Sequence, residues 1–187
     1  LFHLIYWQLS ESSINLLNNI NLLINSLILG FAVGIFTIFF AAALSLSFRQ
    51  SSKLRLLISI STSGYAIPGS VISAGLLIGF DAIFGTSITI YGIFGLILCL
   101  SLRFMTPAYN YSSSSLANIS KSSENALSLV PSNPLKAFSS FYYPQMKSAL
   151  FLGFMIVFIE SVKEQAATLL LRPVGFDTLS TKIYNFT

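Results

Sequence analysis

The sequence predicts an all-α protein, built as a polytopic bundle of transmembrane helices. Of its 187 residues, 54% are hydrophobic and only 9% are charged, and the mean hydropathy is +0.78. A soluble domain usually carries roughly 25% charged residues, so this chain has too few charges to cover a water-exposed surface. Two further signs are apolar stretches of about 20 residues and basic residues gathered in alternate loops between them.

The segment 1–24 opens with aromatic residues and then becomes polar. It starts with Phe2, Tyr6 and Trp7, and of these residue types Tyr and Trp favour the membrane–water interface. We therefore expect either the truncated end of an earlier span or an interfacial helix. Because the chain begins with Leu1 and stops after a polar stretch at Thr187, we also expect it to be a fragment of a longer protein.

Four apolar stretches follow, each long enough or nearly so to cross about 30 Å of hydrocarbon as a helix. They cover residues 25–48, 56–80, 83–102 and 149–171. The second contains Gly64, Pro68 and Gly69, which weaken a helix, so it is expected to be kinked or broken there. These three residues form a candidate hinge, and a fixed kink is equally compatible with them.

The basic residues predict the orientation of the bundle. Arg49, Lys53 and Arg55 lie between the first two stretches, and the segment between the third and fourth holds Arg103, Lys121, Lys136 and Lys147. The remaining loop carries only Asp81. Basic loops stay in the cytoplasm, so we expect both basic loops inside and Glu11, Asp81 and the C-terminal tail outside.

Residues 105–147 form the longest expected soluble segment. Helical pieces are predicted near Leu116, over 124–130 and over 135–143, with a serine at 120, 122 or 123 as a cap and Glu124 in a first turn. Such short helices need a surface to pack against, and a soluble partner would provide one.

Charged residues interrupt the fourth stretch. Glu160, Lys163 and Glu164 are spaced to share one helix face. Charges at such depth are costly, so they either line a translocation path or form a structural ion pair that faces the bundle interior. Two Gly-x-x-x-Gly pairs, Gly30 with Gly34 and Gly75 with Gly79, favour close helix packing.

Several classes of function are disfavoured. The chain has one histidine, His3, and one cysteine, Cys99, which argues against a membrane enzyme built on clustered His, Cys or Asp. A pore metal site would need ligands, and Glu160, Glu164 and Asp177 are the only acidic candidates nearby, so whether this chain binds a metal stays unknown. No phosphate-binding G-x-x-x-x-G-K-[ST] motif is present, so we expect no nucleotide and no other cofactor on this chain. The net charge of +4 fits membrane topology better than a nucleic-acid partner.

Three stretches carry a family resemblance. Residues 64–71 read GYAIPGSV, residues 162–179 read VKEQAATLLLRPVGFDTL, and Glu124, Ala126 and Pro144 match a motif of the form E-A-A-x3-G-x9-I-x-L-P. The chain thereby resembles the permeases of ABC importers, and most of all the ferric-iron group, with its G-Y-A-x-P-G-T-V and K-E-L-P-A-T-L-L-L-R-P-x-G-F-D-T-L runs. It departs from the family at Asn125, Val130, Gln165 and Ala166, and its cytoplasmic motif is one residue longer.

The resemblance implies a MetI-like permease domain over 25–187, with the final span missing. It implies a cytoplasmic coupling loop over 105–147 whose residues Glu124, Ala126, Leu129 and Pro144 contact a separate ATP-binding subunit. ATP would be bound and hydrolysed on that partner, and an extracytoplasmic solute-binding protein would deliver the solute. The expected setting is the lipid of a bacterial inner membrane, crossed several times.

Three alternatives for the transported solute, and one for the mechanism, stay open. The same type of permease could import thiamine, a polyamine or an oxyanion, because the binding protein often sets the solute. A secondary transporter driven by an ion gradient would be marked by paired broken helices in inverted repeats.

Overall fold

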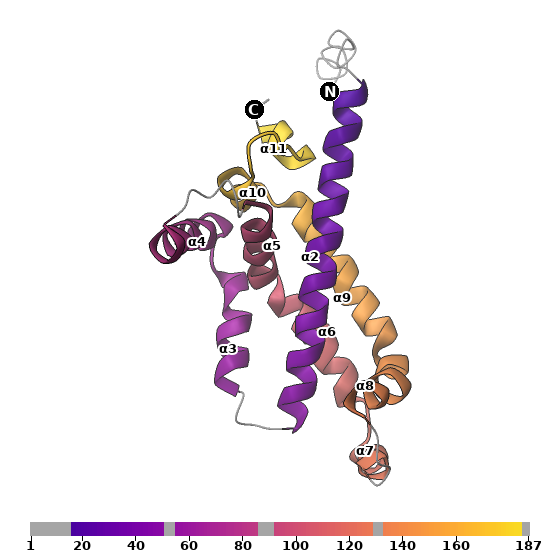
Figure 1. Ribbon diagram of the computed structural model, residues 1–187. Coiled ribbons are helices and arrows are strands. Elements are labelled where there is room, and N and C mark those ends of the chain that lie inside the picture. Colours follow the sequence, from indigo (N-terminus) through magenta and orange to yellow (C-terminus); the bar gives the residue numbers. More distant parts are fainter. Residues whose placement is uncertain (1–15, 51–54, 86–91, 129–132, 185–187) are drawn as a thin grey trace.

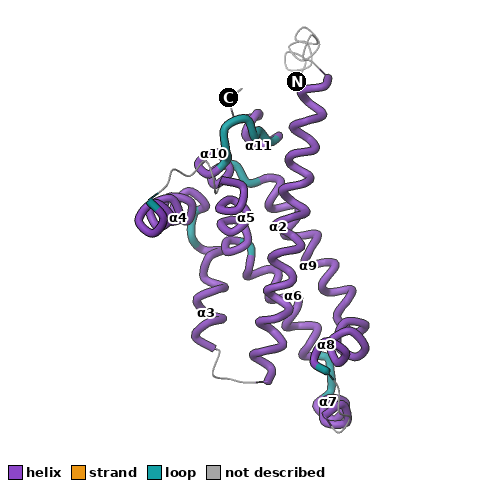
Figure 2. The backbone as a smooth tube through the Cα atoms, viewed as in Figure 1, coloured by secondary structure: helices purple, strands orange, loops and turns teal. Residues whose placement is uncertain are grey.

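The computed structural model describes residues 16–50, 55–85, 92–128 and 133–184, and every regular element within these ranges is helical (Figures 1 and 2). The predicted all-α class is confirmed for this part of the chain. The elements are α2 (Leu16–Gln50), α3 (Arg55–Ser63), α4 (Gly69–Phe84), α5 (Gly92–Arg103), α6 (Met105–Ala117), α7 (Lys121–Ser128), α8 (Pro134–Ala137), α9 (Tyr143–Lys163), α10 (Ala166–Leu171) and α11 (Leu179–Tyr184).

Helix α2 is the longest element, and its 35 residues extend over about 50 Å at 1.5 Å per residue. It contacts α5, α6 and α9 along its length. Its other side leaves Ile28, Ile35 and Phe39 exposed, as expected of a helix that meets lipid on one side. Helix α2 begins at Leu16, before the first apolar stretch that was expected from about residue 25; residues 1–15 lie outside the described part.

Two helices are long and apolar enough to cross a membrane, Ile20–Arg49 and Phe138–Lys163, or up to four if each of two bent helix pairs counts as one span. The first predicted apolar helix is therefore confirmed. The fourth, expected over 149–171, begins earlier and ends at Lys163. Its end is set by Glu164, whose backbone is extended (φ −71°, ψ 119°), so that α10 forms a separate short helix.

The second predicted helix is broken, as its glycines and proline indicated. The segments Leu56–Ala66 and Gly69–Ile83 meet at an angle of 119°. Ile67, which precedes Pro68, has the extended backbone that this position favours (φ −91°, ψ 132°). Helix α4 then continues to Phe84 and ends at Gly85 with φ 59°. Ile83 and Asp81 therefore belong to α4, and not to the third span or the loop before it.

The third predicted helix is α5, and it is followed directly by α6 with a bend of 53°. The expected soluble segment 105–147 is therefore too long at its start, because α6 packs on α2 and α9. Met105, Ala108, Ser112 and Leu116 are buried along one face of α6. Its serines fit there because their hydroxyls bond back to the preceding turn, as Ser112 does to the carbonyl of Ala108 (2.9 Å).

The two ends of the bundle differ in what they carry (Figure 1). One end holds α7 and α8, and a π-helical turn (Phe138–Tyr142) leads from α8 into α9. Helix α7 confirms the predicted helix near Glu124, and Ser120 Oγ accepts the N–H of Ser123 (3.3 Å). The other end holds α10 and α11, tied to α2 by a hydrogen bond from the N–H of Leu179 to Ser26 Oγ (2.8 Å).

Candidate functional site

Ion pairs join distant parts of the chain at two places, which we call the central cluster and the terminal cluster. The central cluster consists of Arg103, Glu164 and the backbone groups that contact them. The terminal cluster consists of Arg49, Glu124 and the end of α6. Each cluster holds one charged residue that the sequence assigned to a site and one arginine that it treated only as a marker of topology.

The central cluster is built on the last residue of α5 and the first residue after α9. Arg103 Nε lies 3.3 Å from Glu164 Oε2, and their side chains are 22% and 13% exposed. The Arg103 guanidinium also donates a hydrogen bond to the carbonyl of Ile67 (2.6 Å). The other Glu164 oxygen accepts the N–H of Ala167 (3.5 Å), in the first turn of α10. Arg103 is thus half-buried at the end of α5, and does not lie in the basic loop where it was expected.

Close contacts surround two of the three candidate hinge residues. A Cβ on Gly69 would lie 2.5 Å from Glu164 Oε1, and a Cβ on Gly64 would lie 2.4 Å from the carbonyl oxygen of Leu102. The backbone contact makes glycine a requirement at position 64, whereas a side chain at position 69 would have to displace the Glu164 carboxylate. Pro68 immediately precedes α4. The geometry of this break is therefore held by contacts with α5 and with Glu164.

The central cluster lies where three helix breaks meet. Ile67 and Gly69 belong to the break between α3 and α4, Arg103 to the bend between α5 and α6, and Glu164 to the break between α9 and α10. A single ion pair and its hydrogen bonds therefore connect the three breaks. This arrangement also satisfies both charges inside an apolar bundle, where an unpaired charge would be costly.

The expectation that Glu160, Lys163 and Glu164 share one helix face is wrong, because Glu164 has left the helix. Glu160 pairs with Lys163 at 3.3 Å, and this pair is more exposed than the central one, at 36% and 65%. Asp177 pairs with Arg172 near α11. Each of the three candidate acidic ligands thus has its own basic partner. Within the described residues, no group of three or more metal-ligating side chains comes together.

The terminal cluster joins α2, α6 and α7. Arg49, in the last turn of α2, donates hydrogen bonds to the carbonyls of Leu116 and Ile119, and its Nε lies 2.6 Å from Glu124 Oε1. A cation is favoured at the C-terminal end of a helix, where carbonyls lack partners. Glu124, at 19% exposure of its side chain, is thus bound to the bundle and largely covered.

The other residues of the expected coupling set are spread over two helices. Ala126 lies on α7, and Pro144 lies in the first turn of α9, where it is exposed. Leu129 lies outside the described residues. Sequence reasoning missed Arg49 and Arg103 as site residues. The available signal was that each arginine stands directly after an expected apolar stretch.

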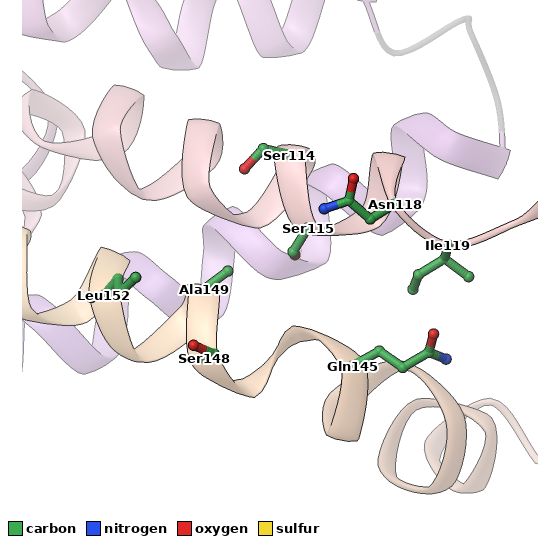
Figure 3. Close-up of a pocket in the computed structure, with 8 residues that line it drawn as sticks. All are labelled: Ser114, Ser115, Asn118, Ile119, Gln145, Ser148, Ala149 and Leu152. Atoms are coloured by element: carbon green, nitrogen blue, oxygen red, sulfur yellow. The ribbon is translucent and has the colours of Figure 1, made fainter.

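A groove of about 330 Å³ runs between α6 and α9 on the side of the terminal cluster (Figure 3). Five of its eight lining residues are polar and none is charged: Ser114, Ser115, Asn118, Ile119, Gln145, Ser148, Ala149 and Leu152. Ser114 and Ser115 bond to carbonyls of their own helix. The groove was not predicted, because it depends on how two segments about thirty residues apart in the sequence diverge.

The chain matches no protein-family model and no curated protein sequence.

Proposed function

We propose that this chain is a membrane-spanning permease subunit of an ATP-driven importer. In this proposal it moves a solute inward across a bacterial inner membrane, and a separate cytoplasmic subunit binds and hydrolyses ATP. An extracytoplasmic solute-binding protein would supply the solute on the other face. The chain itself would perform no chemistry, and would need no cofactor.

The observation that carries the proposal is the short helix α7, which lies beyond the bundle at one end and is attached to α2 through Arg49 (Figure 1). A helix that receives force from a partner must be fastened to what it moves. Glu124 supplies this attachment, because its carboxylate contacts the side chain that also binds the end of α6. A displacement of α7 would therefore be transmitted to α2 and α6 together.

Charge also favours this end as the cytoplasmic one. Arg49, Lys121, Lys136 and Lys147 lie on helices at or near the end that carries α7, and α3 begins there with Arg55. Arg103 no longer counts toward this pattern, and Lys53 lies outside the described residues. The remaining basic residues still favour placement of this end in the cytoplasm.

Ferric iron is the solute we propose, on the resemblance of residues 64–71 and 162–179 to the iron-permease runs. These two runs contribute Gly69 and Glu164, which contact one another in the central cluster. Two segments that resemble runs of the same family thus lie together in space. Thiamine, polyamine and oxyanion permeases remain the alternatives for the solute.

The test is uptake of radiolabelled ferric iron by cells that express the full-length parent protein with its ATPase and binding protein. Glu124→Gln is the variant, because it removes the charge that pairs with Arg49 and preserves side-chain shape. We expect uptake to fall by about tenfold or more, which corresponds to about 1.4 kcal/mol of lost coupling. Because Glu124 attaches α7 to the bundle, we expect the ATPase to co-purify with the variant as with wild type.

Lys121→Gln is the matched control, since it removes one charge from an exposed position on the same short helix. It should leave uptake near the wild-type level. If the wild type binds the ATPase but takes up no iron, the iron assignment is wrong and the permease proposal stands. If no ATPase co-purifies with the wild type, the permease proposal itself is wrong.

A secondary transporter is the second candidate, and the bent helix pairs α3–α4 and α5–α6 favour it. Discontinuous helices are common where such transporters bind their ions. Uptake that continues after ATP depletion, and stops when the ion gradient is collapsed, would select this candidate over the importer.

A further inference from the structure

The contacts of Arg103 and Glu164 differ in strength. Arg103 makes a short hydrogen bond of 2.6 Å to the carbonyl of Ile67, which ties α5 to the α3–α4 break. Its contact with Glu164 is longer, at 3.3 Å, and it engages one nitrogen and one oxygen. Bidentate arginine–carboxylate pairs are the stronger geometry. The weaker link is therefore the one between α5 and the segment that follows α9.

That segment has the form of a unit that can move. Helix α10 is six residues long, and non-helical residues flank it at 164–165 and 172–173. It packs on α4 and α5. Glu164 stands at its start and holds the N–H of Ala167. When the Arg103–Glu164 pair opens, Arg103 keeps its bond to Ile67, so α10 is the part released.

We infer that the Arg103–Glu164 ion pair is an electrostatic lock that holds α10 against α4 and α5, and that the protein has a second state in which this lock is open. Gly69 is part of the lock, because a Cβ at this position would lie 2.5 Å from Glu164 Oε1 and would displace the carboxylate from its place beside α4. The inference concerns a conformational change of this chain, and it holds whichever solute or energy source the protein uses.

The single cysteine of the chain provides a built-in probe of this state. Cys99 is fully buried, and it lies one turn before Arg103 on α5. Ala167 and Leu171 of α10 belong to the same apolar cluster as Cys99. Movement of α10 away from α5 would therefore uncover the thiol, and the rate of its alkylation would report the fraction of open molecules.

The experiment measures alkylation of Cys99 by N-ethylmaleimide in the full chain, in membranes and at one fixed pH. We expect slow labelling of the wild type. Glu164→Gln, which keeps the shape of the side chain but removes its charge, should label about tenfold faster. Because the Glu164 charge also acts directly on the Cys99 thiol, this acceleration supports the lock only if Gly69→Ala accelerates labelling as well. Gly69→Ala should act in the same direction while both charges remain, because the added methyl displaces Glu164.

Lys163→Gln is the matched control, since it removes a neighbouring charge that belongs to the exposed pair with Glu160. It should label at the wild-type rate. Equal acceleration by Lys163→Gln and Glu164→Gln would mean that any charge loss near the end of α9 loosens the bundle, and would overturn the inference.

Wild-type labelling rates in both Glu164→Gln and Gly69→Ala would overturn it as well. If Glu164→Gln does not elute from detergent as a single folded species, the Gly69→Ala rate decides alone: acceleration supports the lock, and a wild-type rate excludes it.

Discussion

Arginine is the basic residue at both clusters, and its shape explains why. The guanidinium of Arg49 contacts two backbone carbonyls and one carboxylate, while that of Arg103 contacts one carbonyl and one carboxylate. A planar group with five donors can serve several acceptors in fixed directions, whereas a lysine ammonium is a single point charge. At both sites, therefore, one side chain connects segments far apart in the sequence.

Arg49→Lys is predicted to loosen α7 while the total charge is preserved. A lysine would keep the attraction to Glu124 but lose at least one of the bonds to the end of α6. Hydrogen bonds to charged groups contribute about 1.5–3 kcal/mol, so α7 should detach roughly tenfold more often. Limited proteolysis with proteinase K should then cut the 118–142 segment correspondingly faster.

The control is Arg172→Lys, the same chemical change at an arginine that pairs with Asp177 near the opposite end of the bundle. It should leave cleavage of the 118–142 segment at the wild-type rate. Equal rates for wild type and Arg49→Lys would show that α7 is held by other contacts.

At the scale of elements, the two Gly-x-x-x-Gly pairs have different surroundings. A Cβ on Gly34 would lie 2.7 Å from the ring of Phe154, and a Cβ on Gly30 would lie 2.9 Å from that of Phe158. Nothing lies within 4 Å of a Cβ built on Gly75 or Gly79. Only the first pair therefore forms a helix contact among the described residues.

Gly34→Val and Gly75→Val should consequently behave differently. The first forces a branched side chain into a filled contact between α2 and α9, which costs about 1–3 kcal/mol. The second places the same side chain in open space on α4. Thermal unfolding in detergent, followed by circular dichroism, should show a lower midpoint for Gly34→Val alone. A similar loss in both would mean that valine destabilises these helices through the backbone and not through packing.

Many of the helices could be predicted from the sequence, because long apolar runs and helix-breaking residues act locally. The run ending at Phe48 predicted most of α2, and Gly64, Pro68 and Gly69 predicted the break before α4. The early end of α9 and the bend after Arg103 were not predictable, since neither Glu164 nor Arg103 weakens a helix by itself. Both helix ends occur where Arg103 and Glu164 contact each other, and these two residues are sixty-one positions apart in the sequence. The site residues were predicted only where a charge stood out locally.

At the scale of the whole molecule, the long axis of the bundle separates α8 at one end from α11 at the other (Figure 1). If this axis crosses the membrane, Lys136 and Lys182 lie on opposite faces. Replacing each by cysteine in a Cys99→Ala background permits labelling with an impermeant maleimide. We expect Lys136→Cys to react only in inverted vesicles and Lys182→Cys only in intact cells. Reaction of both on the same face would exclude a transmembrane long axis.

The rings that join α2 and α9 limit how these helices can move. Phe158 fills the space beside Gly30, Phe154 fills the space beside Gly34, and Phe31 contacts both rings. In these two antiparallel helices, a glycine of α2 thus contacts a phenylalanine of α9 every four residues, which is close to one helical turn. A small translation of α9 along α2 would drive each ring against the next residue, and the following comparable register lies about 5.4 Å away. The ring contacts therefore oppose axial sliding of less than one helical turn, and tilting about them is the motion that this pair permits.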